Sequence, residues 1–188
     1  MSLHGSPLRT AFVGAGYIAD WHAKAIRATR SGELVAVVDR QTSRARALAD
    51  AHRIPHVFAS INEMLDAVPV DVIHLLVPPE LHAAVAEECL AGQAHLFLEK
   101  PMCTSTDECG RVLSLAATRG VQVAVNHNYL FFPSYVKLRD DVRAGRLGQI
   151  DHVSIVWNRP LPQLVGGPFD HWMFREPANL IFETGPHS

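Results

Sequence analysis

The chain has 188 residues, of which 48% are hydrophobic and 19% charged, a balance that is typical of a packed domain and excludes a disordered one. Its formal net charge of -2, with acidic and basic residues interspersed, gives no electrostatic reason to expect nucleic acid or an anionic membrane as a partner. No apolar run reaches the roughly 20 residues of a membrane span. The three cysteines have no metal-binding spacing, so no metal site is predicted, and their odd number fits the reducing compartment of a cytoplasmic protein.

Short apolar runs alternate with longer amphipathic segments over residues 1–125, which is the pattern of a parallel sheet joined by crossover helices. In chain order, the apolar runs predict strands at Arg9–Val13, Leu34–Val38, His56–Ala59, Val72–Val77, His95–Leu98 and Val121–Val125. The segments between them predict helices at Ile18–Arg30, Ser43–Ala51, Asn62–Ala67, Glu80–Ala91 and Ser105–Thr118. Six strands with intervening helices make a complete α/β domain, a doubly wound parallel Rossmann sheet.

The pattern changes in residues 126–188. Pro133–Ala144 predicts a helix, and Ile150–Trp157 alternates apolar and polar residues as a strand with one covered face does. A loop rich in proline and glycine follows at Arg159–Pro168. Because one strand cannot form a sheet, we predict that this region is only the beginning of a second, α+β domain and that the chain is a truncated form of a longer protein.

The strongest local motif follows the first predicted strand and opens the first helix. It has the form G-x-G-x-x-G/A and consists of Gly14, Ala15, Gly16, Tyr17, Ile18 and Ala19. In such a motif the first glycine permits a tight turn, the second lets the backbone approach a pyrophosphate, and the last small residue allows close helix packing. The free N–H groups of the helix N-terminus then bind the anion. The alternative is a strand–helix turn that binds no ligand.

Asp39 ends the second predicted strand, 20 residues after Ala19. A carboxylate at that place accepts hydrogen bonds from the ribose hydroxyls of adenosine, and its charge repels the additional phosphate of NADP. The sequence therefore favours NAD. Arg40 and Arg44 are close enough to hold a 2′-phosphate, so NADP remains possible.

A second candidate site lies at Glu99–Pro101, at the end of the fifth predicted strand, where an open α/β sheet presents its ligand-binding groups. A lysine here, Lys100, can donate a hydrogen bond to a substrate hydroxyl and stabilise the alkoxide that precedes hydride loss. The alternative is a surface lysine beside a proline that starts a loop.

Taken together, six motifs resemble one protein family. The segments GAGYIADWH, VVDR, VPPELH, LEKPM, AGRLG and ETGPH, in this order, are similar to the GFO/IDH/MocA family of glucose–fructose oxidoreductases and inositol dehydrogenases, from about residue 9 to the last residue. The resemblance implies a Rossmann domain, here residues 1–125, followed by an α/β domain with a large open sheet. That second domain, beginning at residue 126, supplies the substrate site and the contacts of a homo-oligomer in the family.

The resemblance also assigns roles to residues of the first domain. Lys100 matches the catalytic lysine of the family's EKP motif, and Glu99 lines the cofactor pocket. Val77, Pro78 and His82 belong to a segment similar to T-P-N-x-x-H, a loop that passes the nicotinamide ribose. Valine replaces the threonine of that motif and Pro79 replaces its asparagine, so a side-chain contact with the cofactor is lost if these positions carry it in the family.

In the second region the resemblance places a general acid/base histidine at His187. Glu183 stands where many family members have aspartate, and if the segment is helical, a spacing of four places both side chains on one face. Asn128 and its neighbours Asn126 and His127 lie just past the sixth strand, where some of them could face the cofactor or the substrate. The alternative for His127 is that it satisfies a backbone carbonyl.

The function that the sequence predicts is NAD(P)-dependent hydride transfer to or from a secondary alcohol of a sugar, inositol or related polyol. Lys100 would bind the reacting oxygen, His187 would take the hydroxyl proton, and Glu183 would orient the imidazole. Two alternatives remain open: an NAD-dependent enzyme that processes glycosides without net redox change, and a dinucleotide-binding module without catalysis. For the chain as it stands, we expect cofactor binding without turnover.

Overall fold

The computed structural model describes residues 6–30, 32–156, 158, 160, 166 and 171–187. The chain divides into two compact units, Met1–Asn126 and His127–Ser188. Within the described residues, no helix is long and apolar enough to span a membrane. The same part of the chain holds no group of three or more histidine, cysteine, aspartate or glutamate side chains placed to bind a metal ion.

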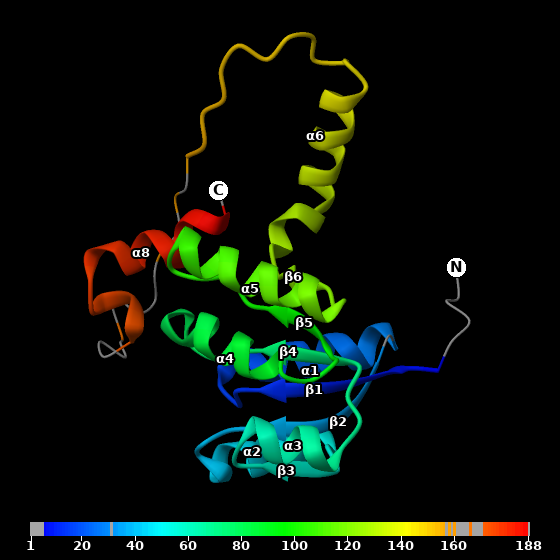
Figure 1. Ribbon diagram of the computed structural model, residues 1–188. Coiled ribbons are helices and arrows are strands. Elements are labelled where there is room, and N and C mark those ends of the chain that lie inside the picture. The colour runs from blue at the N-terminus through cyan, green and yellow to red at the C-terminus, as the bar shows by residue number, and fades with distance from the viewer. Residues whose placement is uncertain are drawn as a thin grey trace. The chain divides into compact units, whose positions relative to one another are not determined.

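The first unit is built on a parallel sheet of six strands in the order β3-β2-β1-β4-β5-β6 (Figure 1). The strands are β1 (Leu8–Val13), β2 (Gly32–Val38), β3 (His56–Phe58), β4 (Val72–Leu75), β5 (His95–Leu98) and β6 (Val123–Val125). The order reverses between β1 and β4, which is the switch point where doubly wound sheets bind their ligands. The predicted α/β fold class is confirmed.

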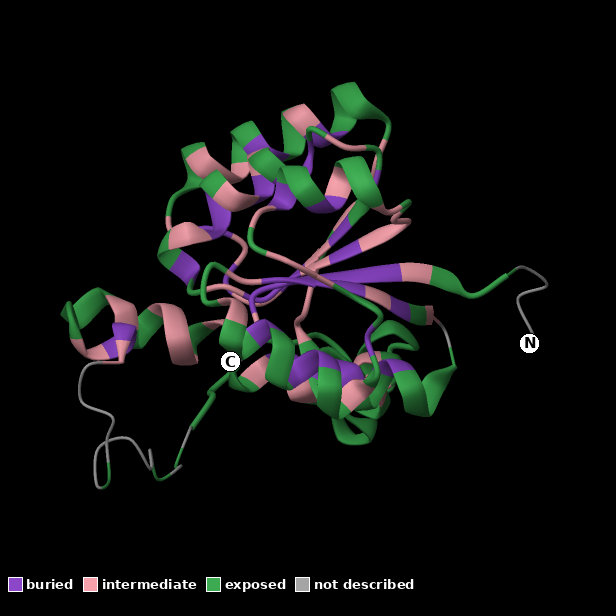
Figure 2. Ribbon diagram, turned by 90° about the horizontal axis from the view of Figure 1, so that it is seen from below, coloured by how far each residue is buried: buried purple, intermediate pink, exposed green. Residues whose placement is uncertain are grey.

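Helices cover both faces of this sheet, with their buried sides turned toward the strands (Figure 2). The helices are α1 (Tyr17–Thr29), α2 (Thr42–His52), α3 (Ile61–Ala67), α4 (His82–Cys89), preceded by the 3-10 turn η1 (Pro79–Leu81), and α5 (Thr106–Arg119). Buried residues of α1 and α2 form one core with one side of the strands. Those of α3, α4 and α5 form the other core.

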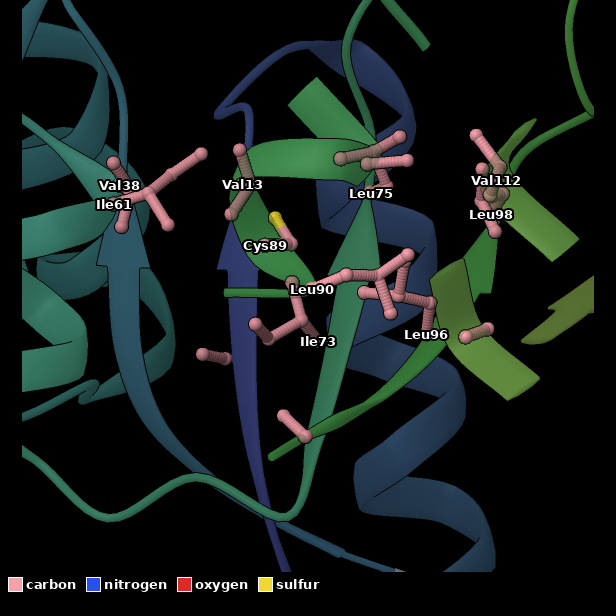
Figure 3. Close-up of a cluster of buried hydrophobic side chains, with 14 of the residues drawn as sticks. Val13, Val38, Ile61, Ile73, Leu75, Cys89, Leu90, Leu96, Leu98 and Val112 are labelled. Atoms are coloured by element: carbon pink, nitrogen blue, oxygen red, sulfur yellow. The ribbon is translucent and has the colours of Figure 1, made fainter. Parts of the chain in front are cut away.

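The larger core shows why the strands are mainly apolar. Ile73 and Leu75 of β4 point to the side of α3, α4 and α5, where they meet Leu96 and Leu98 of β5 (Figure 3). The residue between the first two, His74, lies on the side of α1, against the ring of Phe12. Because helices cover both faces, most positions of β1, β2, β4 and β5 are buried or half-buried. Burying a Leu or Ile side chain fully stabilises the fold by about 1.5–3 kcal/mol.

Where the structure describes the second unit, its regular elements are helical. Its elements are η2 (Asn128–Phe131), α6 (Pro133–Arg143), η3 (Trp172–Phe174), α8 (Pro177–Thr184) and η4 (Gly185–His187). The predicted helix at Pro133–Ala144 is therefore present. The predicted strand at Ile150–Trp157 is wrong over residues 150–156, which lie in no helix or strand, and Trp157 is outside the described residues. An alternating pattern forms a strand only where a neighbouring strand pairs with its backbone, and β1–β6 all pair within the first unit.

An ion pair joins the start of β1 to the turn before β4. Asp71 accepts hydrogen bonds from the backbone N–H of Arg9 at 2.7 Å and from its guanidinium at 2.6 and 3.0 Å. These hydrogen bonds, the one from the guanidinium first, lower the pKa of Asp71 from 3.8 to about 2. A carboxyl group whose pKa is depressed in the folded state stabilises that state above its ordinary pKa and loses the contribution as the pH falls.

We therefore expect the stability of an Asp71→Asn variant to depend less on pH in the acidic range than that of the parent chain. Its urea midpoint should fall less between pH 3.8 and pH 2, the window set by the ordinary and the lowered pKa. The effect should be modest, because both side chains are partly exposed and water screens the pair. Circular dichroism across a pH series measures it. An equal dependence on pH in the two proteins would contradict the assigned role.

Candidate active site

The turn after β1 requires glycine at its first position. Gly14 has a φ of 102°, in the region that L side chains rarely adopt, and its N–H donates to the carbonyl of Val38 at 2.8 Å. A Cβ atom built on Gly14 would lie 2.6 Å from the carbonyl oxygen of Leu76. Only a glycine therefore lets this turn lie against the chain that leaves β4.

The second glycine of the motif faces open space. Gly16 is the N-cap of α1, with an ordinary φ of -80° and no side chain that caps the helix. A Cβ atom on Gly16 would meet no atom within 4 Å. The next residue, Tyr17, is 81% exposed, whereas Ile18 packs against the core shared by α1 and α2. The first N–H groups of α1 therefore have room for an anion, and the helix dipole favours one.

Asp39, directly after β2, lies against this turn. One of its carboxylate oxygens accepts a hydrogen bond from the N–H of Ala15 at 2.9 Å, and the other accepts one from the N–H of Gln41 at 2.8 Å. Arg40, the next residue, and Arg44 in α2 are both exposed. The sequence predicted that this carboxylate and the glycine turn belong to one site, and the structure brings them into contact. Because the amide of Ala15 is already bonded, a phosphate would be met by the amides that follow it.

The loop after β4 is joined to the loop after β5 by a buried histidine. His82 is fully buried. Its Nε2 lies 2.9 Å from the carbonyl oxygen of Val77, and its Nδ1 lies 2.7 Å from that of Pro101 and 3.2 Å from that of Met102. Since both ring nitrogens face backbone carbonyls, any effect of His82 on a cofactor is exerted through the position of the two loops. Val77 is half-buried and Pro78 is exposed.

Lys100 follows β5 at the same edge of the sheet as the glycine turn and the loop after β4. Its backbone N–H donates to the carboxylate of Glu99 at 3.3 Å, and the peptide bond to Pro101 is cis. The lysine side chain is half-buried. Because parallel strands end at a common edge, the first unit gathers the glycine turn, Asp39, Val77 and Lys100 along one side of the sheet.

A network of buried and half-buried polar side chains surrounds Glu99. His22 Nε2 lies 2.8 Å from one carboxylate oxygen of Glu99, and the amide nitrogen of Asn126 donates to the same oxygen at 2.6 Å. His22 Nδ1 lies 2.9 Å from Nδ1 of His74. Burial raises the pKa of Glu99, but the hydrogen bonds from His22 and Asn126 act in the opposite direction and leave it below its ordinary value. Glu99 is therefore ionised at neutral pH.

Sequence reasoning did not assign a role to His22 or His74, and it placed Asn126 only among residues that could face the cofactor or the substrate. A signal for His22 was available, because the residue lies three positions after Ala19 on the face of α1 that is buried. A polar residue on a buried helix face requires a partner. The partner, however, is 77 residues away along the chain, and no local pattern identifies it.

The other predicted site residues lie in the second unit. Asn128 begins η2 and is exposed. Glu183 lies in α8, which ends at Thr184, and His187 ends the 3-10 turn η4; the His187 side chain is outside the described part of the chain. The segment from Glu183 to His187 is thus not one continuous α-helix, and the α-helical spacing that would place both side chains on one face is interrupted. Their roles stay predictions.

Comparison with known proteins gives a consistent result. A family model described as "Oxidoreductase family, NAD-binding Rossmann fold" (GFO_IDH_MocA) matches residues 8–127. D-glucoside 3-dehydrogenase from Escherichia coli is 32% identical over 150 residues, which are 79% of this chain and 43% of that protein. Inositol 2-dehydrogenase from Rhizobium meliloti is 27% identical over 153 residues, 81% of this chain and 46% of that protein. The chain thus spans less than half the length of these curated relatives.

Among solved structures, the WlbA dehydrogenase from Bordetella pertussis, in complex with NADH and UDP-GlcNAcA, superposes with a TM-score of 0.72 at 26% identity. The match covers 76% of this chain and 44% of that one. GenD2 from gentamicin A biosynthesis, in complex with NAD, gives a TM-score of 0.70 at 25% identity and covers 76% of this chain and 40% of that one.

Proposed function

The chain belongs to the GFO/IDH/MocA family of oxidoreductases with an NAD-binding Rossmann fold, and on that basis we propose that it binds NAD along the carboxyl edge of its sheet for hydride transfer with a secondary alcohol of a sugar, inositol or related polyol. One observation carries the proposal. The carboxylate of Asp39 is held at the glycine turn, beside the open space at Gly16. A carboxylate acceptor and free helix amides side by side are what the ribose and pyrophosphate of a dinucleotide require.

The residues present fit NAD in three respects. The N–H groups of the first turn of α1 would bind the pyrophosphate, and Asp39 would accept hydrogen bonds from the adenosine ribose. The charge of Asp39 disfavours the 2′-phosphate of NADP, although Arg40 and Arg44 lie near enough to offset part of that repulsion. Val77 and Pro78 would lie along the nicotinamide half. The structures in complex with NADH and NAD to which this chain is similar support the same cofactor.

In the proposed reaction the bound nicotinamide supplies the hydride acceptor or donor. The ammonium group of Lys100 would donate a hydrogen bond to the reacting oxygen and lower the energy of its developing negative charge. Glu99 would keep the backbone of Lys100 in place. We further propose that His187 exchanges the hydroxyl proton and that Glu183 assists it, as the resemblance to the family implies.

We propose that residues 126–188 begin the substrate and oligomerisation domain of the family, so that the complete enzyme is a homo-oligomer acting on a small polyol or sugar. The relatives named above as glucoside and inositol dehydrogenases support this class of substrate. We also propose a cytoplasmic location, because Cys89, Cys103 and Cys109 are free thiols and a reducing compartment preserves them.

The proposal is tested by titrating the chain with NAD and NADP in a calorimeter. We expect NAD to bind, and to bind more tightly than NADP. A panel of polyols and sugars then tests the reaction in a catalytically active form of the protein, with NADH formation measured by absorbance. Binding of NAD with conversion of a glycoside but no net NADH would favour the non-redox alternative. Absence of NAD binding would reject the proposal outright.

An Asp39→Ala variant should lose about tenfold to a hundredfold of its affinity for NAD, because hydrogen bonds to a charged group contribute about 1.5–3 kcal/mol. Its affinity for NADP should fall less, since the repulsion of the 2′-phosphate is removed at the same time. Calorimetric titration of both nucleotides measures the two changes. Glu33→Ala, which removes an exposed acid from the other end of β2, serves as the control for net charge and should leave the preference unaltered.

A further inference from the structure

Four polar side chains from four different elements meet beside the Glu99–Lys100 peptide. They are His22 from α1, His74 from β4, Glu99 after β5 and Asn126 after β6. We propose that His22 is a positioning residue, which acts through the Glu99 carboxylate to hold Lys100 at the edge of the sheet. The inference rests on the proposed role of Lys100 and adds to it a residue that never touches substrate.

The carboxylate of Glu99 is fixed by three donors. Its side chain is 13% exposed, and that of His22 is 8% exposed. A carboxylate can only accept hydrogen bonds, so the Nε2 atom of His22 must carry a proton at its 2.8 Å contact. Asn126 donates to the same oxygen at 2.6 Å, and the backbone N–H of Lys100 donates to the other oxygen at 3.3 Å. The direction of the carboxylate is therefore set by His22 and Asn126 and passed on to the backbone of Lys100.

The ring of His22 is in turn held from its far side. Its Nδ1 lies 2.9 Å from Nδ1 of His74, so one of these two atoms donates and the other accepts. The ring centroids of Phe12 and Phe97 lie 5.4 and 4.9 Å from that of His74. Burial among such neighbours is the main cause that lowers the pKa of His74 to about 3, which keeps this ring neutral at physiological pH. With both nitrogens engaged, the His22 ring has one orientation.

On its other side Lys100 is held by a second histidine. His82 Nδ1 contacts the carbonyl oxygens of Pro101 and Met102, the two residues that follow the lysine. The backbone of Lys100 is thus contacted by the half-buried carboxylate of Glu99 on one side, and the two residues after it are contacted by the fully buried His82. A rigid backbone is what a lysine needs to present its ammonium group at one place. His22 differs from His82 because it also belongs to α1, the helix whose first turn would bind the nucleotide.

The same helix provides a matched control. Asp20 of α1 pairs with Nε2 of His52 at 2.8 Å, and the His52 side chain is 7% exposed. This pair joins the same two types of group at the same distance as the pair of His22 and Glu99, but it lies between α1 and α2 and its carboxylate is 42% exposed. Asp20 also accepts a hydrogen bond from Lys24 at 2.6 Å. Any general effect of losing a histidine–carboxylate contact of α1 should therefore appear at Lys24 when His52 is changed.

The test uses the lysines as reporters. The sequence contains only Lys24, Lys100 and Lys137, so reductive methylation with a 13C label gives three side-chain NMR signals, and a Lys100→Arg variant identifies one of them. Two substitutions separate the nitrogens of His22. The amide nitrogen of glutamine reaches the place of Nε2, and that of asparagine reaches the place of Nδ1. His22→Gln therefore retains the donor to Glu99, whereas His22→Asn retains only the contact with His74.

We expect His22→Asn to shift the Lys100 signal and His22→Gln to restore it, while His52→Asn shifts Lys24 and leaves Lys100 in place. Equal Lys100 signals in the His22→Asn variant and the parent chain would overturn the proposal, and so would a shift of Lys100 in the His52 variant. If His22→Asn does not fold, the 15N spectrum of the parent chain tests the proposal instead. Signals of His22 that show Nε2 without a proton would refute the proposal. All of these spectra are recorded without nucleotide, so a failure to bind NAD in a separate titration counts against the proposed function alone.

Discussion

A Gly16→Val variant is expected to fold like the parent chain and to lose its affinity for NAD by about a hundredfold or more, a change that corresponds to about 2.8 kcal/mol. The position tolerates a side chain in the folded protein, because its φ of -80° is ordinary and no atom lies within 4 Å of an added Cβ. The branched side chain would, however, occupy the approach to the amides of α1. Thermal unfolding and calorimetric titration of the same samples separate the two effects.

Gly14→Ala is the complementary substitution in the same turn. Here the φ of 102° and the 2.6 Å approach of an added Cβ to the carbonyl of Leu76 predict damage to the fold itself. We expect a loss of about 1–3 kcal/mol or more in the free energy of unfolding, the usual cost of a residue forced into an unfavourable backbone conformation. If Gly16→Val lowered the melting temperature as much as Gly14→Ala, or if it bound NAD normally, the site would not lie where we place it.

Replacing Lys100 by methionine is expected to lower turnover by about a hundredfold to ten-thousandfold in the form of the protein that is active, which is the range that a positioned proton-transfer or charge-stabilising group contributes. Methionine keeps the length and much of the volume of lysine but has neither a charge nor a donor. Affinity for NAD should remain nearly unchanged, because the proposed contact of the ammonium group is with the substrate oxygen. Initial rates from NADH absorbance and a nucleotide titration measure the two quantities.

Lys137→Met is the control for this experiment. Lys137 is an exposed lysine of α6 that pairs with Asp141 one helical turn away, so the same chemical change is made far from the proposed chemistry in the sequence. Its turnover should equal that of the parent protein. Undiminished turnover in the Lys100→Met variant would remove Lys100 from the mechanism and leave the chain as a nucleotide-binding protein whose reaction depends on other groups.

The fold of the first unit could be predicted because its strands are covered on both faces and therefore appear in the sequence as short, mainly apolar runs. Their ends were less predictable. Val72–Val77 is apolar except for His74, yet β4 ends at Leu75, and the backbone of Leu76 and Val77 then passes against the turn of Gly14. The alternation at Ile150–Trp157 predicted a strand that residues 150–156 do not form. Alternating apolar and polar residues indicate a strand with one covered face, but they do not show whether another strand is available to pair with it.

The candidate site could likewise be predicted only in part. The proximity of Asp39 to the glycine turn could be predicted, because adjacent parallel strands end at one edge of the sheet and the spacing along the chain is short. The contact of His22 with Glu99 and the burial of His82 between two loops could not be predicted in this way. Each joins segments whose separation in sequence has no fixed relation to their separation in space. The sequence also does not distinguish a buried histidine from an exposed one.

The hydrogen bond from the Ala15 amide to Asp39 has a consequence for attempts to change the coenzyme that this protein accepts. The carboxylate that would discriminate between the two nucleotides also supplies an acceptor for a backbone group in the loop that would wrap the diphosphate. Substituting it to admit a phosphorylated ribose leaves that amide without its partner and loosens the loop. Coenzyme selectivity and the preorganisation of the loop would then change together. A redesign would succeed only with a replacement, such as serine or asparagine, whose side chain still accepts the hydrogen bond from the N–H of Ala15.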